Sequence, residues 1–180
     1  EQDRLIQAVN AEGDIRQWLY HEDGTLQASI LEDGSKTEFS YNEHRLIDTV
    51  TNAQGHAVSL AYDADLNLRQ VTLPDGTSST WAYDHRGNCT TTTNPLGATD
   101  KYQYDALNRL VRAHLSDGND IRLQYNAYDE VVLAKDNDTE VAFDYTILGS
   151  LTARKQGGKK VTFTYDTEEQ LTAVINEKGE

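Results

Sequence analysis

The stretch "YQYDALNRLVRAH", from Tyr102 to His114, decides the fold that this sequence predicts. Tyr102 and Tyr104 are one residue apart, so on an extended strand their side chains lie on the same face. Residues 105–109 are mostly polar and interrupt the pattern, which resumes with the apolar Leu110. The stretch therefore predicts a strand, a turn and a second strand.

The same arrangement recurs along the chain at intervals of 21, 21, 21, 21, 21, 20 and 20 residues. The tyrosines that repeat the position of Tyr104 are Tyr20, Tyr41, Tyr62, Tyr83, Tyr104, Tyr125, Tyr145 and Tyr165. Two residues before each stands a large apolar residue, and six residues after each stands Leu, Ile, Val or Cys. Seven residues before seven of them stand Gly13, Gly34, Gly55, Gly76, Gly97, Gly118 and Gly158, with Asp138 in the exception. A fixed period of this kind predicts a repeat array, with these residues as its structural anchors.

Within a repeat the spacing is that of β structure. The segment "VTFTY", from Val161 to Tyr165, alternates apolar and polar residues, as a strand with one buried face does. Asp-Gly pairs at positions 33, 75 and 117 favour hairpin turns, because glycine tolerates positive φ. Each repeat thus predicts two antiparallel strands of roughly six to eight residues, about seventeen strands in all. We expect an all-β fold in which hairpin repeats of about 21 residues form a curved or spiralling sheet, with aromatic and Leu side chains on one face and polar ones on the other.

The composition and the net charge limit the classes of partner that the chain can bind. Apolar residues make up 37%, below the usual figure of about 45–50%, so a thin core is expected. The net charge of −14 disfavours nucleic acid, which is bound through a positive stripe, and equally an anionic membrane surface. The only dense group of cations is Arg154, Lys155, Lys159 and Lys160. No apolar segment is long enough to span a membrane.

The sequence contains only weak indications of a metal site. The five histidines (His21, His44, His56, His85 and His114) occupy five different positions of the repeat, which favours solvated turns over ligands that converge. Asp63-x-Asp65-x-Asn67 and Asp136-x-Asp138-x-Glu140 resemble calcium loops, but both lack the glycine that such a loop needs. Ordinary acidic turns are the preferred interpretation, and no metal or cofactor is predicted.

The sequence evidence for a catalytic group is equally weak. Cys89 stands where seven other repeats carry Leu, Ile or Val, which indicates a small core side chain and not a nucleophile. The aspartate after the tyrosine recurs in four repeats, at 63, 84, 105 and 166, and so predicts a cap that binds backbone N–H groups of the turn. Replacing Asp63 or His85 is therefore expected to cost little. We predict no catalytic residue and no enzyme. A tyrosine-lined face that stacks on sugars stays an alternative to tyrosines that only pack the sheet.

With these columns in view, the sequence resembles the YD-repeat, or Rhs, family. The motif of that family is roughly Tyr-Asp-x-x-Gly-x-Leu, and here it appears as "YDHRGNC" from Tyr83, "YDALNRL" from Tyr104 and "YDTEEQL" from Tyr165. The resemblance covers residues 1–180, about eight repeats. Tyr20, Tyr41 and Tyr145 are followed by His, Asn and Thr, which departs from the motif but keeps the period.

The resemblance implies a non-catalytic segment of a hollow β shell in a larger protein. Bacterial members of the family, type VI effectors and shell components of Tc toxins among them, enclose a C-terminal toxin for delivery outside the cell. The implied partners are that toxin domain, other repeat segments of the shell and secretion-apparatus proteins. The alternative is a surface adhesion or glycan-binding module. The self-cleaving Asp-Pro motif of the family is absent from these residues, so neither protease nor toxin is assigned to them.

Overall fold

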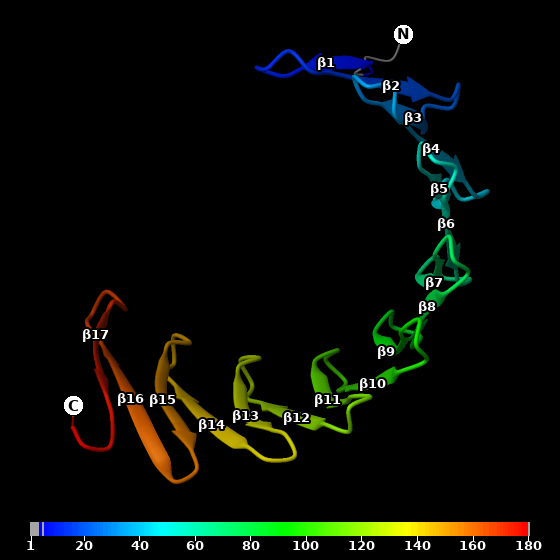
Figure 1. Cartoon of the computed structure of the whole chain (residues 1–180). Helices are drawn as coiled ribbons and strands as arrows, with labels where there is room; N and C mark the ends of the chain where they lie inside the picture. The colour runs from blue at the N-terminus through cyan, green and yellow to red at the C-terminus, as the bar shows by residue number, and fades with distance from the viewer. Residues whose placement is uncertain (1–3, 5, 180) are drawn as a thin grey trace. The chain divides into compact units, whose positions relative to one another are not determined.

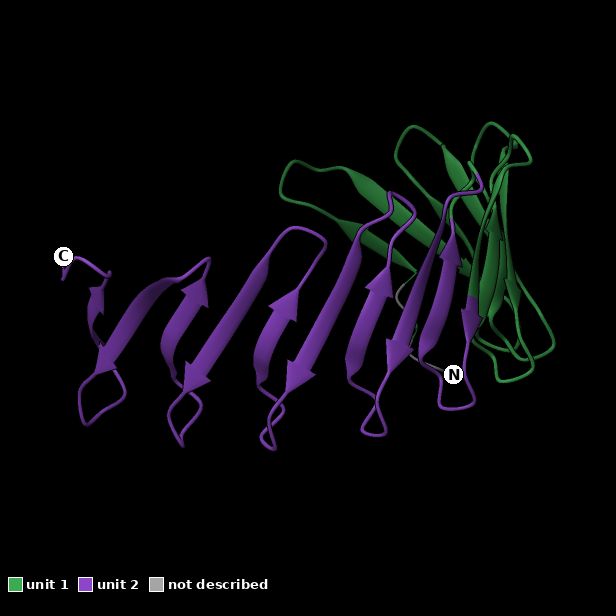
Figure 2. Ribbon diagram, turned by 90° about the horizontal axis from the view of Figure 1, so that it is seen from below, with its two compact units in different colours: residues 1–81, 94–96 green, residues 82–93, 97–180 purple. Residues whose placement is uncertain are grey.

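The computed structural model describes residues 4 and 6–179, and these residues form strands and turns without a helix (Figure 1). The chain divides into two compact units (Figure 2). The first comprises residues 1–81 and 94–96, and the second comprises residues 82–93 and 97–180. The boundary falls within strand β8.

The strands of the first unit follow one another in chain order and are β1 (Gln7–Val9), β2 (Ile15–Tyr20), β3 (Leu26–Ile30), β4 (Lys36–Tyr41), β5 (Ile47–Thr51), β6 (Ala57–Tyr62), β7 (Leu68–Thr72) and the start of β8 (Ser78–Tyr83). The strands of the second unit are β9 (Cys89–Thr93), β10 (Thr99–Tyr104), β11 (Leu110–His114), β12 (Asp120–Tyr125), β13 (Val131–Lys135), β14 (Glu140–Tyr145), β15 (Leu151–Gln156), β16 (Lys159–Tyr165) and β17 (Leu171–Ile175). Within each unit every strand pairs antiparallel with the next. The predicted all-β meander of hairpins is therefore confirmed.

Nine of the seventeen described strands have the predicted length of roughly six to eight residues, and the other eight are shorter. Most have five or six residues, and only β16, with seven residues, exceeds that length among the described strands. The turns use the remaining residues. In the turn after Tyr41, the N–H of Asn42 donates to the carbonyl of Leu46 at 2.9 Å, which leaves three residues between the paired ends. Three-residue loops of this kind combine a type I turn with one residue of positive φ.

The position of positive φ is the same in every repeat. It lies four residues after the anchor tyrosine, at Gly24, Arg45, Leu66, Gly87, Asn108, Asp129, Gly149 and Glu169. Five of these residues are not glycine, so the turn imposes a left-handed backbone on side chains that disfavour it. The anchor glycines of the other turn also have positive φ.

The two 20-residue intervals arise from shortened turns. The N–H of Asp136 donates to the carbonyl of Thr139, one residue nearer than in the longer turns. Gly157 and Gly158 form a two-residue connection between Gln156 and Lys159, with φ of 57° and 79°. Positive φ at both central residues is the signature of a type I′ hairpin turn.

The core is thin, as the composition indicated. Ala28, Ala113 and Ala153 are the only buried hydrophobic residues in the described part of the chain. In β4 and β12 the tyrosine and the apolar residue two before it are half-buried, while the residue between them is exposed. Stability must therefore come from bonds between neighbouring strands as well as from apolar burial.

Candidate functional site

The anchor tyrosines form one column of hydrogen bonds, which we name the tyrosine ladder. In six repeats the tyrosine hydroxyl donates to the backbone carbonyl that lies six residues after the tyrosine of the preceding repeat. The six pairs, at 2.7 to 2.9 Å, are Tyr41–Leu26, Tyr62–Ile47, Tyr104–Cys89, Tyr125–Leu110, Tyr145–Val131 and Tyr165–Leu151. The ladder thus joins each of these hairpins to the one before it.

The accepting carbonyl lies beside a β-bulge. On β4 and β5, Ser40 lies opposite Thr49 and Tyr41 lies opposite Ile47, which leaves Asp48 as the extra residue. The backbone pairing of β5 with β6 then ends at Thr49 and Ser59, and it does not reach Ile47. A half-buried carbonyl without a partner is costly, and the hydroxyl of Tyr62 supplies one at 2.7 Å. The tyrosine hydroxyl therefore gives a partner to a carbonyl that the β5–β6 pairing does not reach.

The residue after the tyrosine caps the turn, as predicted. One carboxylate oxygen of Asp105 accepts the N–H groups of Leu107 and Arg109 at 2.9 and 3.0 Å. The same pair of bonds forms at Asp63, Asp84 and Asp166, and Asn42, Asn126 and Thr146 form it with a side-chain oxygen. Hydrogen bonds from the turn hold the pKa of Asp63, Asp84 and Asp105 below its usual value. Asp63 thus accepts two backbone N–H groups of its turn, and the small cost expected from its replacement stays a prediction.

Arg109 links two repeats in a way that the sequence did not indicate. Its guanidinium pairs with Asp105 at 2.7 Å and with Asp129 of the next repeat at 2.8 Å. It also lies 4.7 Å from the ring centre of Tyr125, a cation–π distance. Arg4 stands at the same place in the repeat, sixteen residues before Tyr20, and lies 5.7 Å from its ring centre. Both arginines stand at the same position of the 21-residue repeat. Too few other repeats carry an arginine there for the sequence to reveal the contact.

The other candidate residues do not converge on a catalytic or metal site. Cys89 begins β9, and burial raises the pKa of its thiol, which opposes the thiolate that a nucleophile requires. In the described residues no group of three or more His, Cys, Asp or Glu could hold a metal ion. Asp63 binds its own turn, so the acidic-turn interpretation is confirmed there.

The five histidines are all exposed. Four lie in turns or between strands, whereas His114 ends strand β11, which corrects the prediction that all of them lie in turns.

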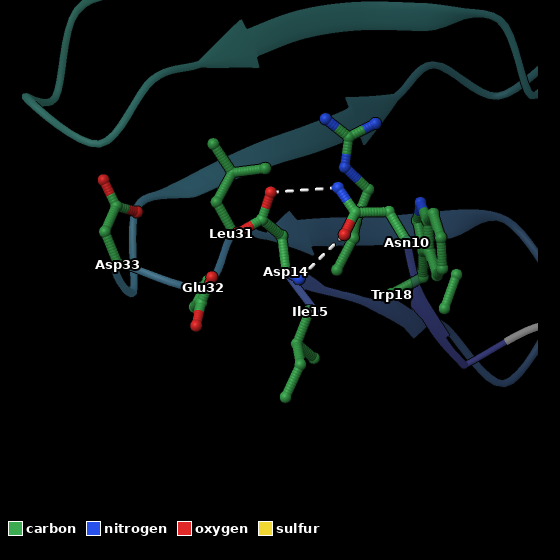
Figure 3. A pocket seen from close by; sticks show the side chains of 9 residues that line it. Asn10, Asp14, Ile15, Trp18, Leu31, Glu32 and Asp33 are labelled. Carbon is green, nitrogen blue, oxygen red and sulfur yellow. Dashed lines mark hydrogen bonds between the residues drawn. The ribbon is translucent and has the colours of Figure 1, made fainter. Parts of the chain in front are cut away.

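A hollow of about 680 Å³ lies in the first unit. It is lined by residues of β1, of β2 and of the turns that precede β2 and follow β3, including Asn10, Asp14, Trp18 and Leu31. Figure 3 shows Asn10 and Asp14 pointing toward one another, joined by bonds of 2.8 and 2.9 Å. The polar groups of Asn10 and Asp14 therefore bond to one another.

In the described part of the chain no helix has the length and apolar character needed to cross a membrane.

Comparison with known proteins agrees with this geometry. Residues 62–99 and 87–120 match the family model described as RHS Repeat. The fold is similar to a chain in the Tc holotoxin pore of Photorhabdus luminescens, with a TM-score of 0.70 and 16% identity over 91% of this chain. It is also similar to TcdB2-TccC3 without its hypervariable C-terminal region, with a TM-score of 0.66 and 17% identity over 96% of this chain.

The chain spans about 11% of the length of both solved chains. No curated protein matches the sequence. The RHS Repeat match covers the stretch from Tyr102 to His114, and the same period continues on both sides of it. Residues 62–120 therefore carry Rhs (YD) repeats, and the chain shares its fold with segments of the Tc toxin structures.

Proposed function

We propose that this chain is a non-catalytic segment of a hollow β shell that encloses a C-terminal toxin domain of its parent protein. The tyrosine ladder is the observation that carries the proposal. Six repeats use their tyrosine in one and the same bond, which joins neighbouring hairpins. A repeated contact of this kind serves a continuous surface, whereas catalysis requires different groups that converge at one place.

The fold similarity to the Tc toxin structures supports the same proposal. Other repeat segments of the parent would complete the shell. Delivery outside the producing cell, by a type VI apparatus or another route, and contact with secretion-apparatus proteins belong to the proposal as well. The alternative of an adhesion or glycan-binding module receives less support, because six anchor hydroxyls donate to backbone carbonyls and cannot also donate to a sugar.

Limited proteolysis of the parent protein tests the proposal. In the wild type, we expect the C-terminal passenger to resist a protease that digests it rapidly once it has been released. Replacing Tyr104 and Tyr125 together with Ala removes two adjacent bonds of the ladder and should expose the passenger. Tyr128→Ala serves as the control, because this exposed tyrosine lies outside the ladder.

Two results would contradict enclosure. One is a passenger that is cleaved equally fast in the intact wild type and after release. The other is binding of a defined glycan by the chain with an affinity that Tyr128→Ala or a ladder substitution abolishes while the fold is intact, which would favour the adhesion module.

A further inference from the structure

The polar face of the second unit carries an excess of cations that the sequence does not reveal. Directly opposed residues of an antiparallel pair project on the same side of a sheet, as do residues two apart in one strand. Arg112 lies opposite Gln103 and Arg122, and Arg122 lies opposite Lys135. Lys101, two residues before Gln103, therefore shares this side with them.

The same side continues through the next three strands. Leu133, two residues before Lys135, lies opposite Ala142, and Ala142 lies opposite Lys155. Lys155 in turn lies opposite Lys160. We name this surface the cationic face, and its six cations are Lys101, Arg112, Arg122, Lys135, Lys155 and Lys160. A hollow of about 210 Å³, lined by Lys101, Gln103, Arg112 and His114, shows that four of the side chains at its β10–β11 end lie together.

Three carboxylates lie on the cationic face, and each is already paired. Asp120 accepts Arg112 and Arg122, both at 2.7 Å. Glu140 pairs with Lys135 at 3.0 Å and Asp144 with Lys155 at 2.6 Å. Lys101 and Lys160 have no ion pair within the described residues. Glu177, which follows β17, accepts the backbone N–H of Lys160 at 2.8 Å and adds a fourth carboxylate beside this end of the face. The face thus holds two more cations than carboxylates, in a chain whose net charge is −14.

The corresponding face of the first unit has no such excess. Its strands carry Ser, Thr, Gln and Ala at most of these positions, as in the opposed pairs Thr49–Ser59 and Gln70–Thr80. Lys36 and Glu38 pair with one another at 2.5 Å, and the bulge residues Asp48 and Arg69 add one charge of each sign. The repeat itself therefore does not require the cations.

We propose that the cationic face binds an acidic polypeptide segment. Seven strands about 4.8 Å apart extend for about 30 Å, which an extended segment of about ten residues matches. Carboxylates spaced by neutral residues can meet the free cations and avoid Asp120, Glu140 and Asp144. A nucleic acid carries a phosphate at every nucleotide, so it would meet those carboxylates and the acidic remainder of the chain. The inference does not depend on enclosure of a toxin.

Fluorescence anisotropy with a labelled peptide of about ten residues, in which glutamate alternates with serine, tests this inference on the full chain. We expect binding in about 20 mM salt that weakens at about 200 mM, since exposed charges are screened. Lys101→Gln together with Lys160→Gln should weaken binding by about fivefold to tenfold. The control is Arg154→Gln together with Lys159→Gln, which removes the same charge on the opposite side of the β15–β16 hairpin and should change binding less than about twofold.

Three results would overturn the inference. Equal weakening by the two double variants would mean that only net charge matters. Tighter binding of an oligothymidylate of about ten nucleotides would make the face a nucleic-acid surface. Absence of peptide binding at low salt would show that the cationic face contacts only solvent and binds no acidic segment. A urea midpoint equal to that of the wild type confirms that each variant is folded.

Discussion

The two units differ in the charge of their polar faces but not in the bonds that hold their strands. Tyr41 and Tyr62 in the first unit, and Tyr104 and Tyr125 in the second, donate to the carbonyl at the same place in the preceding repeat. The polar face is neutral in the first unit and cationic in the second. The repeat thus constrains the tyrosine side and the turns, and leaves the polar side free to acquire a local function.

The largest effect is expected from removal of a ladder tyrosine. Tyr41→Ala and Tyr104→Ala should each lower the free energy of unfolding by about 2–3 kcal/mol, because a half-buried ring and a hydrogen bond are lost. Urea denaturation measures both. Similar values in the two units would support a common ladder. A negligible value in one unit would show that the ladder matters only in the other.

Removal of the hydroxyl alone should have a smaller effect. Tyr41→Phe and Tyr104→Phe leave the carbonyls of Leu26 and Cys89 without their donors, and each should cost about 1 kcal/mol. Tyr128→Phe is the matched control, since this exposed tyrosine is outside the ladder. An equal loss of stability in Tyr128→Phe would show that the effect does not come from the hydrogen bonds of the tyrosine ladder.

Acid should destabilise both units through the turn caps. The pKa of the Asp63 carboxyl in the first unit and that of Asp105 in the second are lowered, by hydrogen bonds from Asn67 and from Arg109 respectively. Their contribution is therefore present above the unfolded value of about 4 and is lost as pH falls through the lower folded value. The urea midpoint should fall over this range.

Asparagine separates the charge of the cap from its hydrogen bonds. Asn42 and Asn126 already cap turns with an amide oxygen. Asp63→Asn and Asp105→Asn should therefore keep the turn and reduce the dependence of the urea midpoint on pH. An unchanged dependence in both variants would assign acid sensitivity to other carboxylates, such as Asp120, whose pKa is lowered by Arg112 and Arg122.

The smallest effect on stability is expected at the cationic face. Replacing Lys101 and Lys160 with Gln should change the free energy of unfolding by less than about 0.5 kcal/mol, because exposed charges without partners contribute little. The same variants should weaken binding of the acidic peptide. Loss of stability in proportion to the loss of binding would mean that the cations hold the fold and not a partner.

The sequence predicted the tyrosine side of the molecule better than the polar side. A single period revealed the anchors Tyr104 and Gly118, the cap Asp105 and the hairpins, because each depends on local backbone geometry repeated about every 21 residues. The acceptor of the Tyr62 hydroxyl is a backbone carbonyl beside a bulge, which leaves no mark on residue identity.

The cationic face escaped detection for a different reason. Lys101, Arg112, Arg122 and Lys135 are ten to thirteen residues apart in the sequence and become neighbours only through strand register. The length of eight strands was overestimated because the turns take residues that would otherwise extend the strand pairing, as Asn42 to Leu46 do.

Electron cryomicroscopy of the intact parent protein tests the central claim most directly. The proposal predicts that residues 1–180 form part of a closed wall, joined to further repeat segments, with density for the passenger inside it. An array that projects freely, with both faces of its sheet in solvent and the passenger elsewhere, would contradict the proposal.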